Sequence, residues 1–144
     1  MSTTRQITRA AELEALAAFR DLIDAACQDQ PDIDEQVRYD LKLAVDEACT
    51  NIIQHGYAGM NPGSIIFALE VSPRQVTLTI TDFGHAFEPS EPPRPDAEAG
   101  LHDQPTGGFG LYFIYQTMDE VSYETTDACN RLILVKRLQR IPPA

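Results

Sequence analysis

The sequence predicts an α+β two-layer sandwich, in which three helices cover one face of a mixed, mostly antiparallel sheet. Three observations predict it. Two successive segments repeat apolar residues at helical spacing, two further segments alternate apolar and polar residues, and a glycine-rich stretch precedes two last strand-like segments. The resulting order is strand, helix, helix, strand, strand, loop, helix, strand, strand, which forms two layers around one core. With 144 residues the chain has the size of one domain, so we expect a single domain over residues 1–144.

The first part of the chain is predicted to form one strand and two helices. Residues 4–8 suit a short strand, and a first helix is expected over about residues 10–28. A proline then separates it from a second helix, which Asp32 or Asp34 can cap and which should run to about His55. The apolar positions expected to face the core are Leu13, Leu16, Phe19, Leu22, Ile23 and Ala26 in the first helix, and Val37, Leu41, Ala44, Val45, Ala48 and Ile52 in the second.

The middle of the chain changes to a period of two residues. Residues 64–71 and 75–82 are predicted strands, because Val76, Leu78 and Ile80 alternate with threonines in the second of them. The two predicted strands are joined through Ser72, Pro73 and Arg74.

The last part of the chain begins with a long irregular connection. Five prolines between residues 84 and 107 exclude a regular helix or strand, and so long a connection in a small domain is typical of a functional lid. We therefore expect a lid over about residues 84–107. A third helix opens at residues 107–110, and the final strands are expected over residues 121–125 and 132–138.

Composition and charge argue against some classes of partner and indicate the compartment. The net charge of −11 and a pI near 4.5 argue against direct binding of nucleic acid, which needs a basic face. No segment approaches the run of about 20 apolar residues that a membrane helix needs, and no apolar signal core follows the first residues, so we expect a cytoplasmic protein without membrane contact. The three widely spaced cysteines, Cys27, Cys49 and Cys129, suit buried thiols in a reducing compartment.

The second helix carries the first candidate site. Glu47 and Asn51 lie four residues apart, so they project from the same side of the helix, on the shoulder of its apolar stripe. A carboxylate at the rim of a cleft could deprotonate a hydroxyl, and a carboxamide oxygen could bind Mg²⁺. Taken alone, the pair is more typical of two ordinary half-exposed polar residues on a helix.

The second candidate site is the end of the strand over residues 75–82. Asp82 ends this strand, and Gly84 permits a tight turn directly after it. A carboxylate in this position can accept a hydrogen bond from an exocyclic amine such as that of adenine. A simple strand-ending turn would produce the same local pattern.

The third candidate site is the start of the third helix. Glycines allow backbone N–H groups to approach a phosphate, and a helix N-terminus adds a partial positive charge. An acidic protein could hold a triphosphate in this way without a lysine cluster, although glycine-rich turns are common. The residues concerned are Thr106, Gly107, Gly108, Phe109, Gly110 and Leu111.

Taken together, the three sites follow the order of the Asn box, the Asp-x-Gly box and the glycine box of the GHKL-type (histidine kinase-like) ATPases. Within that superfamily, residues 43–57, 82–89 and 108–121 resemble the motifs of the anti-sigma factor serine/threonine-protein kinases of bacterial partner switching. The resemblance runs from about Asp34 to Leu138 and is most specific in the Asn-box helix. It implies the Bergerat-type ATP-binding fold.

The resemblance also implies a function and residue roles. Such proteins bind Mg-ATP, phosphorylate an anti-anti-sigma antagonist protein and otherwise sequester a sigma factor, and they are commonly homodimers. By this resemblance Glu47 is the catalytic base, Asn51 is the Mg²⁺ ligand, Asp82 contacts adenine and Gly84 shapes the adenine pocket, while Gly108 and Gly110, with the residues around them, face the phosphates.

Two other functions fit parts of the pattern. An ATP-dependent protein-binding module would bind nucleotide without phosphoryl transfer. The catalytic fragment of a histidine kinase would need an upstream phosphoacceptor histidine, and residues 1–30 contain no histidine.

Overall fold

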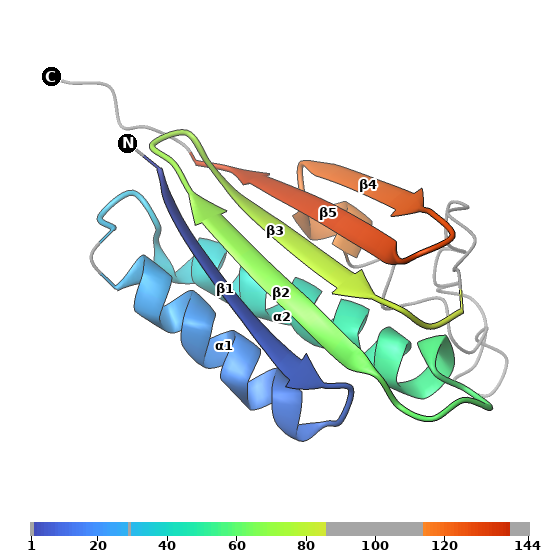
Figure 1. The fold of residues 1–144 in the computed structure, drawn as a ribbon. Helices are drawn as coiled ribbons and strands as arrows, with labels where there is room; N and C mark the ends of the chain where they lie inside the picture. The colour runs from blue at the N-terminus through green and yellow to red at the C-terminus, as the bar shows by residue number, and fades with distance from the viewer. Residues whose placement is uncertain (1, 29, 86–113, 139–144) are drawn as a thin grey trace, which may run out of the picture.

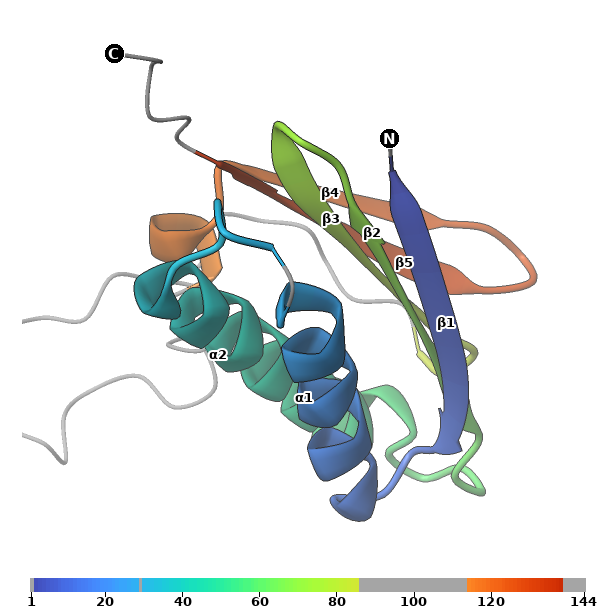
Figure 2. The same ribbon diagram turned by 90° about the vertical axis from the view of Figure 1, so that its left-hand side faces the viewer.

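The computed structural model describes residues 2–28, 30–85 and 114–138, and it shows a five-stranded sheet with helices on one face (Figure 1). The sheet has the strand order β1-β2-β3-β5-β4, and every described pairing is antiparallel. The strands are β1 (Thr3–Ala10), β2 (Ser64–Val71), β3 (Gln75–Asp82), β4 (Glu120–Thr125) and β5 (Asn130–Arg137). Figure 2 shows the helices packed on a single side of the sheet, which confirms the predicted two-layer α+β sandwich.

Helix α1 (Glu14–Cys27) starts four residues later than the sequence predicted. Strand β1 continues to Ala10, which pairs with Ser64, and the backbone N–H of Ala11 donates to the carbonyl of Gly63. Leu13 therefore precedes the helix and is 60% exposed, so its expected place in the core is wrong. A pattern of apolar spacing cannot reveal this, because β2, the strand that pairs with β1, lies more than fifty residues away in the chain.

Helix α2 (Glu35–Asn51) begins as predicted at an aspartate cap. The Asp34 carboxylate accepts a hydrogen bond from the backbone N–H of Val37 at 2.8 Å, which satisfies one of the free N–H groups of the first turn. After Asn51 the chain continues in one wide π-helical turn, η1 (Ile52–Gly56). Single π turns are rare and frequently occur at functional sites.

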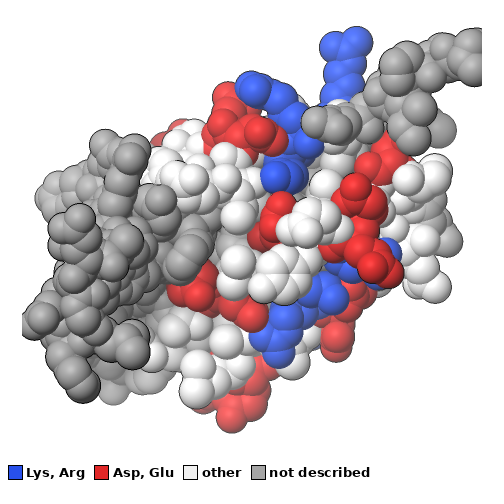
Figure 3. Space-filling view, turned by 180° about the vertical axis from the view of Figure 1, so that it is seen from behind, with Lys and Arg blue, Asp and Glu red and all other residues white. Residues whose placement is uncertain are grey.

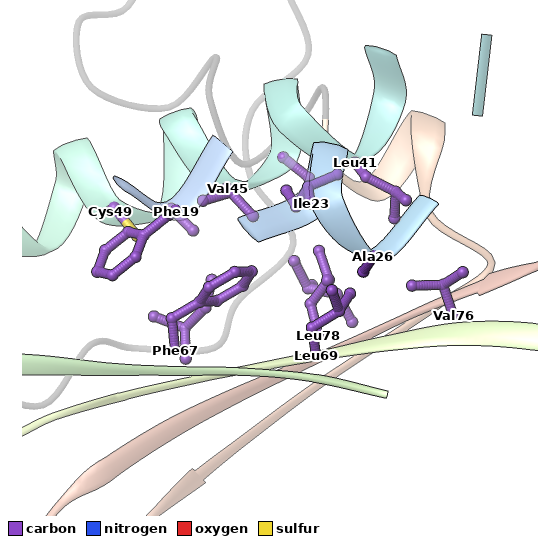
Figure 4. Packing of buried hydrophobic residues seen from close by; sticks show 14 of the residues in the cluster. Phe19, Ile23, Ala26, Leu41, Val45, Cys49, Phe67, Leu69, Val76 and Leu78 are labelled. Atoms are coloured by element: carbon purple, nitrogen blue, oxygen red, sulfur yellow. The ribbon is translucent and has the colours of Figure 1, made fainter. Parts of the chain in front are cut away.

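The core lies between the helix pair and the inner face of the sheet. The rings of Phe19 from α1 and Phe67 from β2 are tilted against each other with centroids 5.1 Å apart, and Leu41, Val45 and Leu78 fill the space along the layer (Figure 4). All five side chains are fully buried, and burial of each such side chain stabilises the fold by about 1.5–3 kcal/mol.

Residues 114–117 are helical and pack on the same core. Ile114 and Met118 are buried in the hydrophobic cluster. The Lys136 ammonium of β5 donates to the carbonyl of Thr117 and forms an ion pair with Asp40 of α2 at 3.4 Å. This lysine thus joins the sheet, α2 and the end of the third helix. The predicted start of that helix, at residues 107–110, lies outside the described residues.

Charges of both signs mix on the helix-covered side of the molecule (Figure 3). Arg20 of α1 pairs with Asp46 of α2 at 2.8 Å, and Lys42 of α2 pairs with Asp24 of α1 at 2.7 Å. These ion pairs cross the seam between the two helices. In the part of the chain that the structure describes, no helix is long and apolar enough to cross a membrane.

The opposite face of the sheet is open and holds a shallow hollow of about 490 Å³. It is lined by Gln6, Ile66, Ala68, Thr79, Thr81, Arg131 and Ile133. Side chains alternate between the two faces of a strand, so this hollow lies across the sheet from Asp82 and Asn130. It is separate from the candidate site described below.

The three cysteines differ in accessibility. Cys27 and Cys49 are buried, as the sequence predicted, whereas Cys129 is only half-buried. Burial raises the pKa of both the Cys27 and the Cys49 thiol, and the negative charges of Asp46 and Asp82 raise that of Cys49 further.

This difference predicts selective alkylation. Only the thiolate reacts with iodoacetamide, and a buried thiol with a raised pKa presents almost none. In the folded protein at pH 8 we expect Cys129 to be labelled at least about tenfold faster than Cys27 or Cys49. Peptide mass spectrometry over a time course measures the three rates, and protein in 6 M guanidinium, in which all three should react, serves as the control. Equal rates in the folded protein would contradict the packing described above.

Candidate functional site

The two candidate residues of α2 lie near its carboxyl end. Glu47 and Asn51 are both half-buried, as expected for the shoulder of the apolar stripe, and Ala48 and Cys49 beside them are buried. Among the described residues, neither the Glu47 nor the Asn51 side chain has a hydrogen-bond or ion-pair partner. The adjacent Asp46, by contrast, is bound to Arg20. Two polar groups at the same end of one helix are thus left available to a ligand.

Asp82 is only 5% exposed, and its two carboxylate oxygens differ in their surroundings. Oδ1 accepts hydrogen bonds from the backbone N–H of Gly84 at 2.9 Å and from the Asn130 side-chain amide at 3.0 Å. No described residue donates to Oδ2. A buried carboxylate is costly unless it is hydrogen-bonded, so the one-sided bonding of Asp82 leaves an acceptor for a further donor.

Tyr57 connects the turn after α2 to the end of β3. Its hydroxyl donates to the carbonyl of Ser64 at 2.7 Å and accepts from the backbone N–H of Phe83 at 3.0 Å. Burial raises the pKa of this phenol, and the nearby charge of Asp82 raises it further, although the Phe83 hydrogen bond acts in the opposite direction. Tyr57 therefore stays protonated at neutral pH and keeps its donor.

The turn that follows β3 packs directly on the turn that follows α2. The backbone N–H of His85 donates to the carbonyl of Gly56 at 2.6 Å, and His85 Nε2 lies 2.9 Å from the carbonyl oxygen of Ala58. A Cβ on Gly84 would overlap the Gly56 carbonyl oxygen and lie 2.6 Å from its carbon. Only glycine at position 84 permits this approach, which brings Asp82 beside the segment that begins directly after Asn51.

The structure thus brings the end of β3, which carries Asp82, against the turn that follows α2. A Cβ on Gly56, five residues after Asn51, would lie 3.8 Å from Oδ1 of Asp82, in ordinary van der Waals contact. The third site, Thr106–Leu111, lies outside the described residues, as do residues 86–107 of the expected lid.

Asn130 is the residue of this site that the sequence reasoning missed. It is 3% exposed at the first position of β5 and pairs in register with Asp82. In the sequence it is one polar residue in a turn before a strand, where asparagine is common. Only the pairing of β3 with β5, which are about fifty residues apart, reveals that its amide lies against Asp82.

The available groups suit a nucleotide with a divalent cation. The Asp82 acceptor fits an exocyclic amine, and the Asn51 amide oxygen is a hard ligand of the type that Mg²⁺ binds. Within residues 2–28, 30–85 and 114–138, no cluster of three or more His, Cys, Asp or Glu side chains is arranged to hold a metal ion. A Mg²⁺ ion bound through Asn51 would therefore take its remaining ligands from phosphate oxygens and water, as Mg²⁺ commonly does.

Comparison with known proteins identifies the family of this chain. The family model of the histidine kinase-like ATPase domain matches residues 9–136. The chain is 34% identical to the serine/threonine-protein kinase BtrW of Bordetella bronchiseptica, over 69% of this chain and 70% of that one. It is also 34% identical to the serine-protein kinase RsbW of Bacillus velezensis, over 60% of this chain and 56% of that one.

Two further comparisons cover more of the chain. The anti-sigma F factor of Clostridium novyi is 28% identical, over 88% of this chain and 84% of that protein. Among solved structures, the RsbU and RsbW domains of a Mycobacterium tuberculosis protein superimpose with a TM-score of 0.68 and 18% identity, over 96% of this chain but only 33% of that one. At this identity the structural match supports the fold alone. The family match covers most of the chain, so this protein belongs to the histidine kinase-like ATPase family, on the branch of the anti-sigma factor serine/threonine-protein kinases.

Proposed function

We propose that this protein is an ATP-dependent serine/threonine kinase that phosphorylates an antagonist protein of the anti-anti-sigma type and otherwise binds a sigma factor. The kinase and anti-sigma names of its relatives support the proposal. The single structural observation that carries it is Asp82. This carboxylate is buried, is bonded through only one oxygen among the residues that the structure describes, and is packed beside the turn that follows α2.

The residues divide into four roles in this proposal. Asp82 accepts the exocyclic amine of adenine through Oδ2, and Gly84 maintains the close turn that forms the pocket. Asn51 ligates Mg²⁺, which neutralises phosphate charge when it is bound. Glu47, one helical turn before Asn51, accepts the proton of the incoming serine or threonine hydroxyl. The phosphates are assigned to the backbone of residues 106–111, where the sequence predicts a helix N-terminus.

The net charge of the chain is consistent with this division. With 22 acidic and 11 basic residues, the protein has little positive charge to offer a triphosphate. Backbone N–H groups and a cation can replace basic side chains, since both bind phosphate without adding net positive charge to the chain itself.

The first test is nucleotide binding. We expect the wild type to bind Mg-ATP saturably, and Asn51→Ala to weaken binding by about tenfold or more, or about 1.4 kcal/mol, because the metal loses its side-chain ligand. Isothermal titration calorimetry with and without EDTA measures the effect. Removal of Mg²⁺ should weaken the binding of ATP to the wild type but change its binding to Asn51→Ala little.

The matched control for that experiment is Gln6→Ala. Gln6 also has an amide side chain, but it is exposed and lines the open face of the sheet. This variant should bind Mg-ATP like the wild type. No saturable uptake by the wild type at millimolar Mg-ATP would refute the proposed function as a whole.

The partners, the assembly and the lid stay predictions. We propose a sigma factor and a phosphorylatable antagonist as protein partners, a homodimer as the assembly and the cytoplasm as the compartment, without direct contact with nucleic acid. The single-domain assignment over residues 1–144, with a lid at about 84–107, is likewise a proposal. Sedimentation equilibrium of the free protein measures the assembly state directly.

A further inference from the structure

The Asn130 side chain is the centre of a small buried polar cluster at the inner face of the sheet. Its Nδ2 lies 3.0 Å from Asp82 Oδ1, 3.0 Å from the Gly84 carbonyl oxygen and 3.3 Å from the His85 carbonyl oxygen. Its Oδ1 lies 3.4 Å from the Thr125 hydroxyl, which can donate to it. Every group around Nδ2 is therefore an acceptor.

These neighbouring groups determine the orientation of the Asn130 side-chain amide. The NH₂ group is a double donor and the amide oxygen is an acceptor, so turning the amide around would set one oxygen against three others. Neither a leucine nor an aspartate could replace it, because the first has no donor and the second would bring a carboxylate against Asp82. Position 130 therefore requires a hydrogen-bond donor, and a side chain of similar volume without a donor does not suffice.

Asn130 controls the Asp82 carboxylate in two ways. With the N–H of Gly84, it gives Oδ1 two donors, so the carboxylate is held in one rotamer and only Oδ2 is left to accept. It also binds two carbonyls of the turn over residues 84–85, the same turn that packs against Gly56. One side chain therefore holds both the Asp82 carboxylate and the turn beside it.

We propose that Asn130 is a positioning residue that determines which nucleobase this protein accepts, by holding Asp82 as a pure acceptor that selects 6-aminopurines over 6-oxopurines. The inference rests on the proposed ATP-binding function. A 6-amino group donates to Oδ2, whereas a 6-oxo group would place a second acceptor against the carboxylate. A buried mismatch of this kind leaves both groups without partners, which is costly.

The proposal is tested by comparing ATP and ITP, each with Mg²⁺, which differ in the 6-substituent and in the proton that a 6-oxopurine carries on the neighbouring ring nitrogen N1. Calorimetry should show wild type binding ATP at least about 30-fold more tightly than ITP. In Asn130→Ala the carboxylate can rotate and take up water, so the ratio of the two Kd values should fall about tenfold. If Asn130 had a purely structural role, the substitution would weaken the binding of both nucleotides equally and leave the ratio of the two Kd values unchanged.

Two further variants test whether the hydrogen-bond donor at position 130 controls the ratio of the two Kd values. Asn130→Ser keeps one donor, so its ratio should lie between those of wild type and Asn130→Ala. Arg131→Ala is the matched control, because Arg131 is the next residue of β5 but is exposed and lines the hollow on the open face. It should keep the wild-type ratio.

A measurement on the wild type does not depend on the variants being folded. The side-chain NH₂ protons of Asn130 should exchange with solvent slowly in a ¹⁵N-resolved spectrum, because Nδ2 is enclosed by acceptors. Fast exchange, or a ratio that Asn130→Ala and Asn130→Ser leave at the wild-type value, would overturn the inference. If the wild type binds neither nucleotide, the proposed function fails instead, so the two failures are distinguishable.

Discussion

Replacing Glu47 with glutamine is expected to slow phosphoryl transfer to the antagonist protein by about 10²–10⁴-fold, the usual contribution of a general base. Binding of Mg-ATP should change by no more than about twofold, because the proposed role of Glu47 is to accept the proton of the hydroxyl and not to hold the nucleotide. Glutamine has nearly the same shape but cannot take up that proton. Glu47 is half-buried without a described partner, so the exchange breaks no interaction within the described residues.

Asp46→Asn is the matched control for this experiment. It also removes one negative charge from α2, at the adjacent position, but Asp46 forms a partly exposed ion pair with Arg20. Such pairs contribute little to stability, about 0–1 kcal/mol, so the protein should stay folded and active. Transfer of labelled phosphate from ATP to the antagonist, under single-turnover conditions, measures both variants.

The possible outcomes separate the competing functions. Transfer at the wild-type rate by Glu47→Gln would remove this residue from the mechanism. If the wild type transfers no label while ATP still alters its affinity for a partner, the protein is a nucleotide-dependent binding module, and the kinase proposal is wrong.

Replacing Gly84 with alanine is expected to destabilise the fold by about 2–4 kcal/mol. The added Cβ would overlap the carbonyl of Gly56, a backbone group that cannot rotate away, and overpacking of this kind costs about 1–3 kcal/mol. Relief by movement of the turn would break the hydrogen bond from His85 N–H to Gly56, a further loss of about 0.5–1.5 kcal/mol. The same movement displaces the wall beside Asp82, so affinity for Mg-ATP should fall about 30-fold or more, equivalent to about 2 kcal/mol.

Gly56→Ala tests the same contact from its other side. A Cβ on Gly56 would meet the nearest atom, Ile52 Cγ2, at 3.4 Å, which is ordinary contact. Its free energy of unfolding should therefore stay within about 0.5 kcal/mol of the wild type. Urea denaturation measures stability, and calorimetry measures binding in the folded fraction. Equal stability of the two alanine variants would show that the close approach of the two turns is not rigid.

Much of the fold was predictable because its signals are local. The alternation in residues 75–82 predicted β3 with its observed bounds, and an aspartate before an amphipathic segment predicted the cap of α2 at Asp34. The expected start of α1 was wrong, because the end of β1 depends on its pairing with β2. No local sequence pattern predicts this pairing of strands.

The candidate site divides in the same way. Glu47 and Asn51 could be placed on one side of a helix from their spacing, and Asp82 could be placed at the end of a strand followed by a permissive glycine. The role of Asn130 could not be predicted from the sequence, because its amide donates a hydrogen bond to a carboxylate 48 residues away in the chain. The same holds for Tyr57, whose hydroxyl links Ser64 to Phe83 across two turns.

By itself, then, the sequence determined the order and type of the described elements, the acidic character on which the proposed amide and cation binding of phosphate rests, and the residues proposed for the chemistry. Residue spacing along one helix or strand is enough for these properties. Only the tertiary structure decided that the Asp82 carboxylate is bonded through one oxygen among the described residues, that this carboxylate lies beside the turn after α2, and that Gly84 must lack a side chain. The physical reason is that these properties arise from strand pairing and from contact between two turns, which bring together groups that the chain separates.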